Sequence, residues 1–274
     1  MSKQLRVQWR CNGLSDFFRG IIAIHQQLAD IEGLQITPCI CSNNKFSEVF
    51  EYAEIIPHEY WQFDRALIDL GFTREPVHWN LVRTALDTCG RIAICSYMMP
   101  DLGRADIGGF KWLFTPKQSV QDIIGQRIRN IVTGGYEVIH VRVHMDELLS
   151  DHRDAEIEKA LEHIDEVIRK TDVPIVLLSD DSRINELAPP SLLKSGITPS
   201  HSFRYGESVP EHEVLDILTD LWLIIGARKV TNITSFQWGA SGFSLLPCCV
   251  FGIPYEGVRI NLKSKELNPQ EKKI

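Results

Sequence analysis

The sequence predicts an α/β protein with two Rossmann-like domains and a cleft between them, on three observations. Short apolar runs, typical of buried parallel strands, alternate with amphipathic helices along the chain. The alternation occurs in two blocks, and Phe114, Thr115 and Pro116 interrupt it between them. A length of 274 residues suits two domains of moderate size. We therefore expect a first domain at residues 1–117 and a second at residues 118–274.

The first block opens with a strand, a tight turn and a helix, followed by a second strand. Such a unit places the N-terminus of its helix where an anion can bind. The rest of the block is less regular, and a loop is expected over residues 101–109. The elements predicted for the first block are strands over 5–9, 35–41 and 91–95 and helices over 17–30, 62–70 and 78–88.

The second block is more regular. Its continuous apolar runs predict strands that are buried on both faces. The helix over 154–170 carries its apolar residues on one stripe and has opposite charges four residues apart. The polar tail after residue 263 is expected to fray. The elements predicted for the second block are strands over 136–142, 173–178 and 229–233 and helices over 120–132, 154–170, 211–225 and 235–246.

One of these strands carries the most informative pattern in the chain. The run Tyr136–Arg142 is apolar but ends in His140 and Arg142. Ligands of open α/β sheets bind at the carboxyl ends of the strands, so this strand would deliver a cation into a crevice. Arginine is suited to bidentate contact with phosphate. The alternatives are that Arg142 is a surface ion-pair partner and that His140 is a hydrogen-bonded core histidine.

Composition narrows the function classes. A formal net charge of −7 argues against general nucleic-acid binding, but it allows a local basic pocket for one phosphorylated ligand. The seven cysteines lack zinc-type spacing and are typical of core residues in a reducing compartment. No signal peptide is visible, and no apolar run approaches the roughly 18 residues of a membrane span. We expect a cytoplasmic or otherwise soluble intracellular protein with no bound metal; its oligomeric state is not indicated.

Four short motifs follow one another between residues 136 and 245. They are His140-Val141-Arg142, then Ser179-Asp180-Asp181, then Arg204 to Glu207 leading into Leu215-Asp216-Ile217, and finally Thr231 to Gln237. In this order they resemble the catalytic region of the core α1,6-fucosyltransferases and the nodulation fucosyltransferases. The resemblance to the α1,2- and protein O-fucosyltransferases is more distant. The segment 12–19 is similar to the glycine-containing loop of the same superfamily.

The resemblance implies a GT-B-like architecture and an inverting, metal-independent glycosyl transfer. The second domain would bind a nucleotide sugar, with GDP-fucose as the first choice, and the first domain would bind a glycan or small glycoside acceptor. The nucleotide sugar is a substrate, so no cofactor is implied. Arg142 would stabilise the charge on the departing β-phosphate. The other residues expected to contact the donor are His140, Asp180, Asp181, Arg204, Asp216, Thr234 and Ser235, with Asn12 and Gly13 from the N-terminal loop.

Several of these residues also have a purely structural explanation. Thr234 and Ser235 open a predicted helix, where they could cradle a phosphate or only cap the helix. Asp180 or Asp181 could accept hydrogen bonds from the amino groups of guanine, or Asp181 could cap the helix that follows.

The remaining donor contacts have structural alternatives too. Asp216 lies one helical turn before Asp220, and the pair could form a solvated face. Arg204 could simply pair with Glu207.

An inverting transfer also needs a base that takes the proton of the acceptor. The first candidates are Asp146, just beyond the His-x-Arg strand, and Asp16 in the N-terminal loop; Glu147 and Asp151 are alternatives. Four tryptophans of the first block could form the floor of a sugar site, although the core is the expected place for each. They are Trp9, Trp61, Trp79 and Trp112.

The segment after Arg142 departs from the family pattern. The family carries a second arginine there, but this chain has Val143, and its acid, Asp146, is displaced by one position. The donor therefore stays open between GDP-fucose, another GDP-sugar and a UDP-sugar such as UDP-xylose. Two further hypotheses are a non-catalytic sugar-nucleotide-binding module and a divalent-metal hydrolase that uses Asp180 and Asp181.

Overall fold

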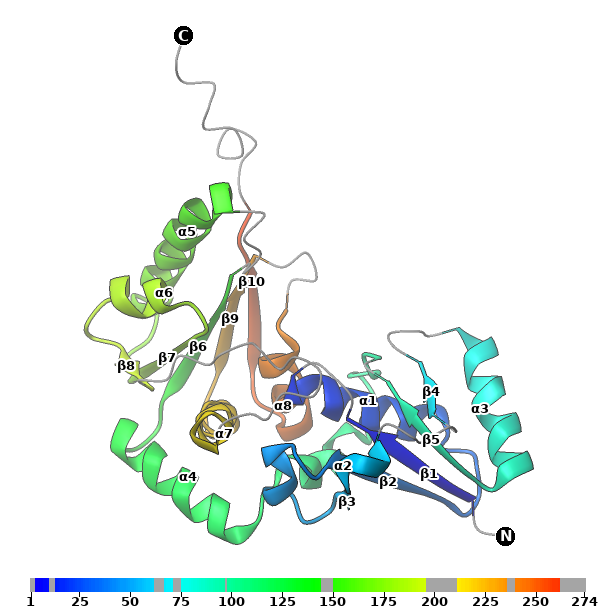
Figure 1. Ribbon diagram of the computed structural model, residues 1–274. Helices are drawn as coiled ribbons and strands as arrows, with labels where there is room; N and C mark the ends of the chain where they lie inside the picture. Colours follow the sequence, from blue (N-terminus) through cyan, green and yellow to red (C-terminus); the bar gives the residue numbers. More distant parts are fainter. Residues whose placement is uncertain are drawn as a thin grey trace. The chain divides into compact units, whose positions relative to one another are not determined.

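The computed structural model describes residues 3–9, 13–61, 67–70, 75–96, 98–143, 150–195, 211–235 and 240–261. Within these ranges the chain forms two α/β units, each built on its own five-stranded sheet (Figure 1). The first unit comprises residues 1–121 and 201–214, and the second comprises residues 122–200 and 215–274. The predicted fold class, two Rossmann-like α/β units, is confirmed.

The sheet of the first unit has the strand order β3-β2-β1-β5-β4. All of its neighbouring strands run parallel, and β1 is central. Its strands are β1 (Lys3–Gln8), β2 (Leu34–Cys41), β3 (Glu54–Ile56), β4 (Leu67–Asp69) and β5 (Arg91–Cys95). Its helices are α1 (Leu14–Gln27), α2 (His58–Trp61) and α3 (Pro76–Cys89), with the 3₁₀ helices η1 (Lys45–Glu48) and η2 (Ile107–Phe114).

Local sequence sets the ends of the two long helices of this unit. Helix α1 follows Gly13, which offers no capping side chain, and its first turn carries Asp16 at the positive end of the helix dipole. Helix α3 begins with Pro76, whose fixed φ and missing N–H suit a first helical position. It ends at Gly90, whose φ of 70° lies in the left-handed region that glycine adopts without strain.

Aromatic rings fill the core of the first unit. Trp9 stacks on Phe17 with ring centroids 5.0 Å apart and contacts Phe46 at 4.9 Å. Phe18 contacts Phe114 edge-on at 4.7 Å. All five side chains are buried. Trp9 therefore belongs to the core, as expected from its sequence context.

The second sheet has the strand order β10-β9-β6-β7-β8, again with all neighbours parallel. Strands β7 and β8 lie on one side of β6, and β9 and β10 lie on the other, so the strand order reverses between β6 and β9. The strands are β6 (Glu137–Arg142), β7 (Ile175–Ser179), β8 (Leu193–Lys194), β9 (Val230–Thr234) and β10 (Tyr255–Arg259). The helices are α4 (Gln118–Ile131), α5 (Ser150–Ile168), α6 (Ser182–Leu187), α7 (Glu211–Ile225) and α8 (Gly242–Phe251).

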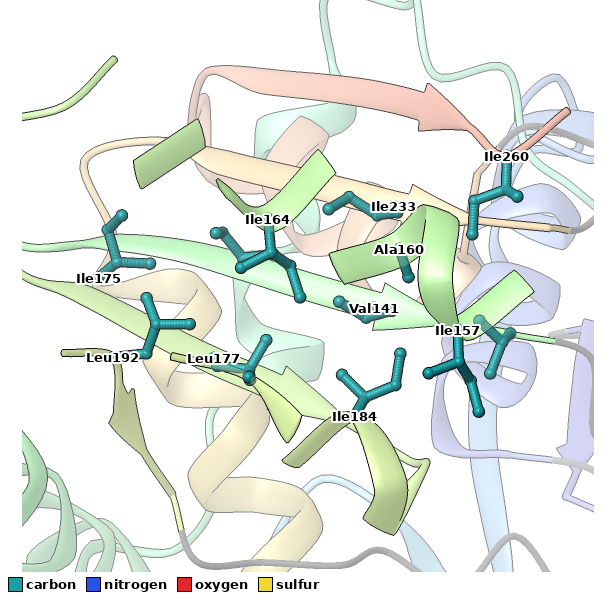
Figure 2. Close-up of a cluster of buried hydrophobic side chains, with 13 residues drawn as sticks. Val141, Ile157, Ala160, Ile164, Ile175, Leu177, Ile184, Leu192, Ile233 and Ile260 are labelled. Atoms are coloured by element: carbon teal, nitrogen blue, oxygen red, sulfur yellow. The ribbon is translucent and has the colours of Figure 1, made fainter. Parts of the chain in front are cut away.

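Different helices cover the two faces of the second sheet. On one face, Ile157 and Ile164 of α5 pack with Val141 of β6 in a cluster that also includes residues of α6 (Figure 2). On the other face, side chains of α4, α7 and α8 pack with Val138 of β6, Leu223 of α7 among them. Because side chains alternate along a strand, His140 and Arg142 share the face of Val138.

Two predicted helices are wrong in part. Of the helix expected near residues 62–70, residues 62–66 lie outside the described residues, and Leu67–Asp69 form a strand that gains backbone partners from β5 at the sheet edge. Of the helix expected over 235–246, residues 236–239 lie outside the described residues, and helix α8 covers Gly242–Phe251. The short elements β3, β8 and β10 were not predicted, because partial exposure or brevity leaves them without a periodic apolar pattern. Helix α6 was anticipated only as the helix that Asp181 could cap.

Most of the cysteines that the structure describes are small core residues, while Cys89 is exposed and Cys249 is partly exposed. Six are free thiols, and Cys39, Cys41, Cys95 and Cys248 are buried. Burial raises the pKa of the Cys248 thiol to about 12, with a smaller contribution from neighbouring Cys249. Across the described ranges, no three His, Cys, Asp or Glu side chains are grouped to hold a metal ion. No helix in that part of the chain combines the length and apolar content that a bilayer crossing requires.

Candidate functional site

The candidate site lies at the carboxyl edge of the second sheet, where the strand order reverses. Arg142 is the last residue of β6 and is in register with Thr234, the last residue of β9. Ligands of open α/β sheets bind outside the carboxyl ends of the strands at such a switch point. Arg142 Nη1 lies 3.0 Å from Asp180 Oδ2, just after β7. The Asp180 side chain is 3% exposed and that of Arg142 is 27% exposed, so part of the guanidinium meets solvent.

Asp181, the next residue, is engaged on both of its carboxylate oxygens. Its Oδ1 accepts a hydrogen bond of 2.8 Å from the backbone N–H of Arg183 and so caps helix α6. Its Oδ2 accepts from Arg153 Nε at 3.1 Å and from Nη2 at 2.7 Å. Asp181 therefore has the structural role that the sequence offered as the alternative to guanine binding.

A buried polar network holds His140 two residues before the edge. Its Nδ1 lies 2.9 Å from Ser244 Oγ and 3.3 Å from Asn232 Nδ2. Asn232 Nδ2 donates to the His140 carbonyl at 2.9 Å, while its Oδ1 accepts from the Ser241 N–H and the Tyr255 hydroxyl, both at 2.9 Å. Asn232 thus connects β6, β9, β10 and the start of α8.

The same network fixes the orientation of the Asn232 amide. The Ser241 backbone N–H can only donate, so the Asn232 atom facing it is the carbonyl oxygen and the other is the amide nitrogen. Ser244 Oγ lies 2.9 Å from His140 Nδ1 and 3.4 Å from the Ser241 carbonyl, so it joins the His140 ring to the start of α8. The sequence showed Asn232 only as a member of the fourth motif, and its role as organiser of His140 was missed.

Thr234 is the last residue of β9 and so is not part of a helix, which corrects the sequence prediction for this residue. Its side chain is fully buried. The Ser235 backbone N–H donates to the Arg142 carbonyl at 3.2 Å, so it already has a partner within the sheet edge. Residues 236–239 lie outside the described residues, and helix α8 covers Gly242–Phe251, with the Ser241 N–H before it donating to Asn232.

Two acids lie on α7, one helical turn apart, in different states. Asp216 is half-exposed and pairs with Arg127 of α4 at 2.6 Å. Asp220 is completely buried, and its Oδ1 has no hydrogen-bond partner among the described residues. Burial, with a smaller contribution from the Asp216 charge, raises the pKa of Asp220 to about 8, although a hydrogen bond from Ser195 opposes the shift. The alternative of a solvated acidic face is therefore wrong for Asp220.

The first unit supplies fewer of the predicted residues. Gly13 is the residue before α1, and Asp16 in its first turn forms an ion pair with Arg19 at 2.9 Å. Burial lowers the pKa of Arg19, and the charge of Asp16 opposes that shift. Trp79 is buried, whereas Trp112 is 38% exposed and contacts the Tyr52 ring.

Other predicted residues fall outside what the structure describes. Asn12, Asp146, Glu147 and Arg204 lie outside the described residues, as do the side chains of Asp151 and Trp61. The geometry above consequently concerns the part of the site built by β6, β7, β9 and the helices that follow them.

Comparison with known proteins gives a fold but no close relative. No protein-family model and no curated protein sequence matches the chain. NodZ α-1,6-fucosyltransferase soaked with GDP-fucose matches with a TM-score of 0.54 at 14% identity, over 91% of this chain and 93% of that chain. POFUT1 in complex with GDP-fucose matches with a TM-score of 0.51 at 11% identity, over 94% of this chain and 98% of that chain.

The fucosyltransferase NodZ from Bradyrhizobium gives a TM-score of 0.52 at 12% identity, over 90% of this chain and 92% of that chain. The chain has the fold of these fucosyltransferases. The resemblance inferred from four sequence motifs is thereby confirmed at the level of architecture. With so few identical residues, the match speaks for the fold alone, and the chemistry has to be argued from the site.

Proposed function

We propose that the chain is an inverting, metal-independent glycosyltransferase that transfers fucose from GDP-fucose to a glycan or small glycoside. The observation that carries the proposal is the partly exposed Arg142 guanidinium at the switch point of the second sheet. The shared fold with fucosyltransferases studied with GDP-fucose supports the choice of donor. In this proposal residues 118–274 bind the donor and residues 1–117 bind the acceptor.

The proposed reaction breaks the bond between C1 of the sugar and the β-phosphate oxygen, and the electron pair stays on the phosphate. Arg142 stabilises this charge with a guanidinium whose position is fixed by Asp180, so little reorganisation is needed. The acceptor hydroxyl attacks C1 from the opposite side, which inverts the configuration, and its proton passes to a carboxylate. Arg19 already engages Asp16, so we place Asp146 first as the base.

Around the nucleotide we assign His140, Asp180 and Asp216 as donor contacts. His140 lies two residues before the sheet edge, and Ser244 and Asn232 hold its ring. Asp216 provides a carboxylate on α7. Thr234 lies beside Arg142 at the carboxyl ends of β9 and β6. Arg204, Asn12 and Gly13 complete the proposed set of donor contacts.

The decisive experiment measures transfer and donor hydrolysis across a panel of nucleotide sugars, including GDP-fucose and UDP-xylose, in the presence of a chelator. Replacing Arg142 by Ala is expected to lower kcat by roughly 10²–10³, as the loss of one preorganised donor does elsewhere. Because Arg142→Ala leaves the buried Asp180 carboxylate without its cation, the double variant Arg142→Gln/Asp180→Asn should accompany it.

The double variant replaces the Arg142–Asp180 ion pair by two neutral side chains, so no unpaired charge is left buried. A loss of activity in this variant can then be attributed to catalysis and not to a folding defect. A folded double variant with full activity would show that Arg142 does not act on the leaving group. Arg129→Gln is the matched control, since Arg129 is an exposed arginine of α4 in the same unit. Loss of all activity in the chelator would contradict the metal-independent mechanism.

A non-catalytic sugar-nucleotide-binding module is the second candidate. Val143, which stands where the family pattern has a second arginine, is completely buried in the apolar cluster beneath α5, so no second cation follows Arg142 directly. Calorimetry with GDP and UDP distinguishes the two functions. Tight binding of GDP without turnover of any donor in the panel would favour the binding module.

A further inference from the structure

The candidate site needs more positive charge than the predicted residues supply. Arg142 is paired with Asp180, and Arg153 is paired with Asp181, so these four side chains at the carboxyl edge sum to zero. A nucleoside diphosphate brings several negative charges, and its recognition favours an excess of cations. Another basic side chain on the same edge and the same face would correct this balance.

The strand register places Arg259 in that position. Arg142 of β6 is in register with Thr234 of β9, and Thr234 is in register with Arg259, the last residue of β10. Neighbouring strands lie about 4.8 Å apart, so the Cα atoms of the two arginines are separated by about 10 Å, with Thr234 between them. The side chain of arginine is long enough for both guanidinium groups to reach one diphosphate.

Burial on β10 shows which face Arg259 shares. Val258 and Ile260 pack into the apolar cluster beneath α5, together with Val141 and Ile233. Because side chains alternate along a strand, Arg259 lies on the opposite face, which is the face of Arg142. Tyr255, four residues earlier on that face, packs with the cluster of α7 and α8, which agrees with this assignment.

Arg259 is also available for a ligand. The residue is exposed, and within the described ranges the structure records no hydrogen bond or ion pair for its side chain. Its neighbour Ile260 donates its backbone N–H to the Thr234 carbonyl at 2.8 Å, which fixes the end of β10 against β9. The guanidinium therefore projects from a backbone that is held in place.

We propose that Arg259 is a second phosphate-binding residue, which with Arg142 clamps the diphosphate of the nucleotide sugar across Thr234. This assignment rests on the proposed function and deepens it. In this chain the second cation comes from the edge strand β10, which β9 separates from β6, and the residue directly after Arg142 is a buried valine. The contact is made by the phosphates alone, so it adds nothing to the affinity for the nucleoside.

The test compares the binding of GDP, UDP and guanosine by calorimetry to the full chain and its variants. Arg259→Gln should weaken the binding of GDP about tenfold, as expected for one charge-assisted hydrogen bond at an exposed site, and leave that of guanosine unchanged. Arg259→Lys should keep part of the affinity. Arg129→Gln removes the same charge from an exposed site on α4 and should bind GDP as the unaltered chain does.

The salt dependence provides a second readout that a structural role would not change. Removing one phosphate contact should reduce the slope of log affinity for GDP against log salt concentration, whereas a fold defect would weaken GDP and guanosine alike. If Arg259→Gln binds GDP as tightly as the unaltered chain, the assignment of Arg259 is wrong while the proposed function stands. If the unaltered chain binds neither GDP nor UDP, the proposed function itself is wrong and Arg259 falls with it.

Discussion

Each of the two sheets has one central strand, and the residues at the carboxyl ends of these two strands differ in character. Strand β1 is central in the first sheet and β6 in the second, and the strand order reverses beside each of them. Beyond β1 comes Trp9, which is 5% exposed and wedged between Phe17 and Phe46. Strand β6 instead ends in Arg142, a partly exposed charged side chain at the sheet edge. Topology thus decides where a site can form, and the residues at the strand end decide whether one does.

The buried side chains around β1 and β6 differ in the same way as the strand ends. Next to β1, the side chains beneath α1 are almost all apolar or aromatic. Next to β6, the face of Val138 is interrupted by His140 and Asn232, whose polar groups satisfy one another. Most buried polar groups in folded proteins are hydrogen-bonded, and fully bonded networks favour one arrangement of a core. We infer that the second unit is organised for precise positioning and the first for packing.

The largest effect on stability is expected in the first unit. Trp9→Ala should lower the free energy of unfolding by about 3–5 kcal/mol, because it removes the ring that fills the core between Phe17 and Phe46. Urea unfolding measures the loss, with Trp112→Ala as the control, because Trp112 is 38% exposed and its loss leaves a smaller cavity. A Trp9→Ala variant as stable as the unaltered chain would break the comparison between the two strand ends.

The next effect concerns the polar network of the second unit. Asn232→Leu keeps the size of the side chain but leaves the Ser241 N–H and the Tyr255 hydroxyl without their acceptor, which should cost about 3 kcal/mol. It should also weaken GDP binding, because the His140 ring loses its contact with the Asn232 amide. Unfolding and calorimetry are measured together, with the neighbouring Ile233→Val as the control for a simple packing loss. Equal GDP affinity in Asn232→Leu would show that the network serves stability alone.

The strand that carries Arg142 could be predicted because its signal lies in consecutive residues of the sequence. An apolar run that ends in histidine and arginine is readable within seven residues, and the strand lies where it was predicted, within one residue. The role of Asn232 was not readable, since its partner His140 is 92 residues away and only the sheet brings them together. Asn232 also accepts from the N–H of Ser241, the residue before helix α8, which is a contact that the sequence pattern does not show.

Strand β4, unlike β6, carries no local signal in the sequence. Its three residues have no pattern of their own, and pairing with β5 overrides the helical spacing expected there. Arg259 was missed for a related reason, because β10 alternates only weakly between buried and exposed residues. Its position became meaningful only when the register tied it to Thr234 and Arg142.

A smaller, pH-dependent effect is expected at Asp220. The pKa of this carboxyl is about 8 in the folded chain against an ordinary value of 3.8. Between these values the unfolded chain loses the proton that the folded chain keeps, so stability falls as pH rises from about 4 to about 8. Asp220→Asn removes this dependence and should become more stable relative to the unaltered chain by up to about 1.4 kcal/mol per pH unit.

Urea unfolding at about pH 5 and about pH 8 measures this difference. Asp216→Asn is the contrasting variant, because it removes the partly exposed carboxylate that lies one turn earlier on the same helix and pairs with Arg127, and with it the smaller contribution of that charge to the pKa of Asp220. A stability difference for Asp220→Asn that stays constant with pH would mean that Asp220 is ionised in the folded chain, with a partner for its charge.

The smallest effect separates Asp181 from Asp180. Asp181→Asn keeps a side-chain oxygen to cap α6 but loses the ion pair with Arg153, whose side chain is 41% exposed, so the loss should be about 0.5–1 kcal/mol. GDP affinity should stay unchanged, because both oxygens of Asp181 are already engaged within the fold. Calorimetry distinguishes a structural role of Asp181 from a donor contact. Weaker GDP binding in Asp181→Asn would show that Asp181 contacts the donor. Polar contact with the nucleotide would then extend beyond the sheet edge to the start of α6.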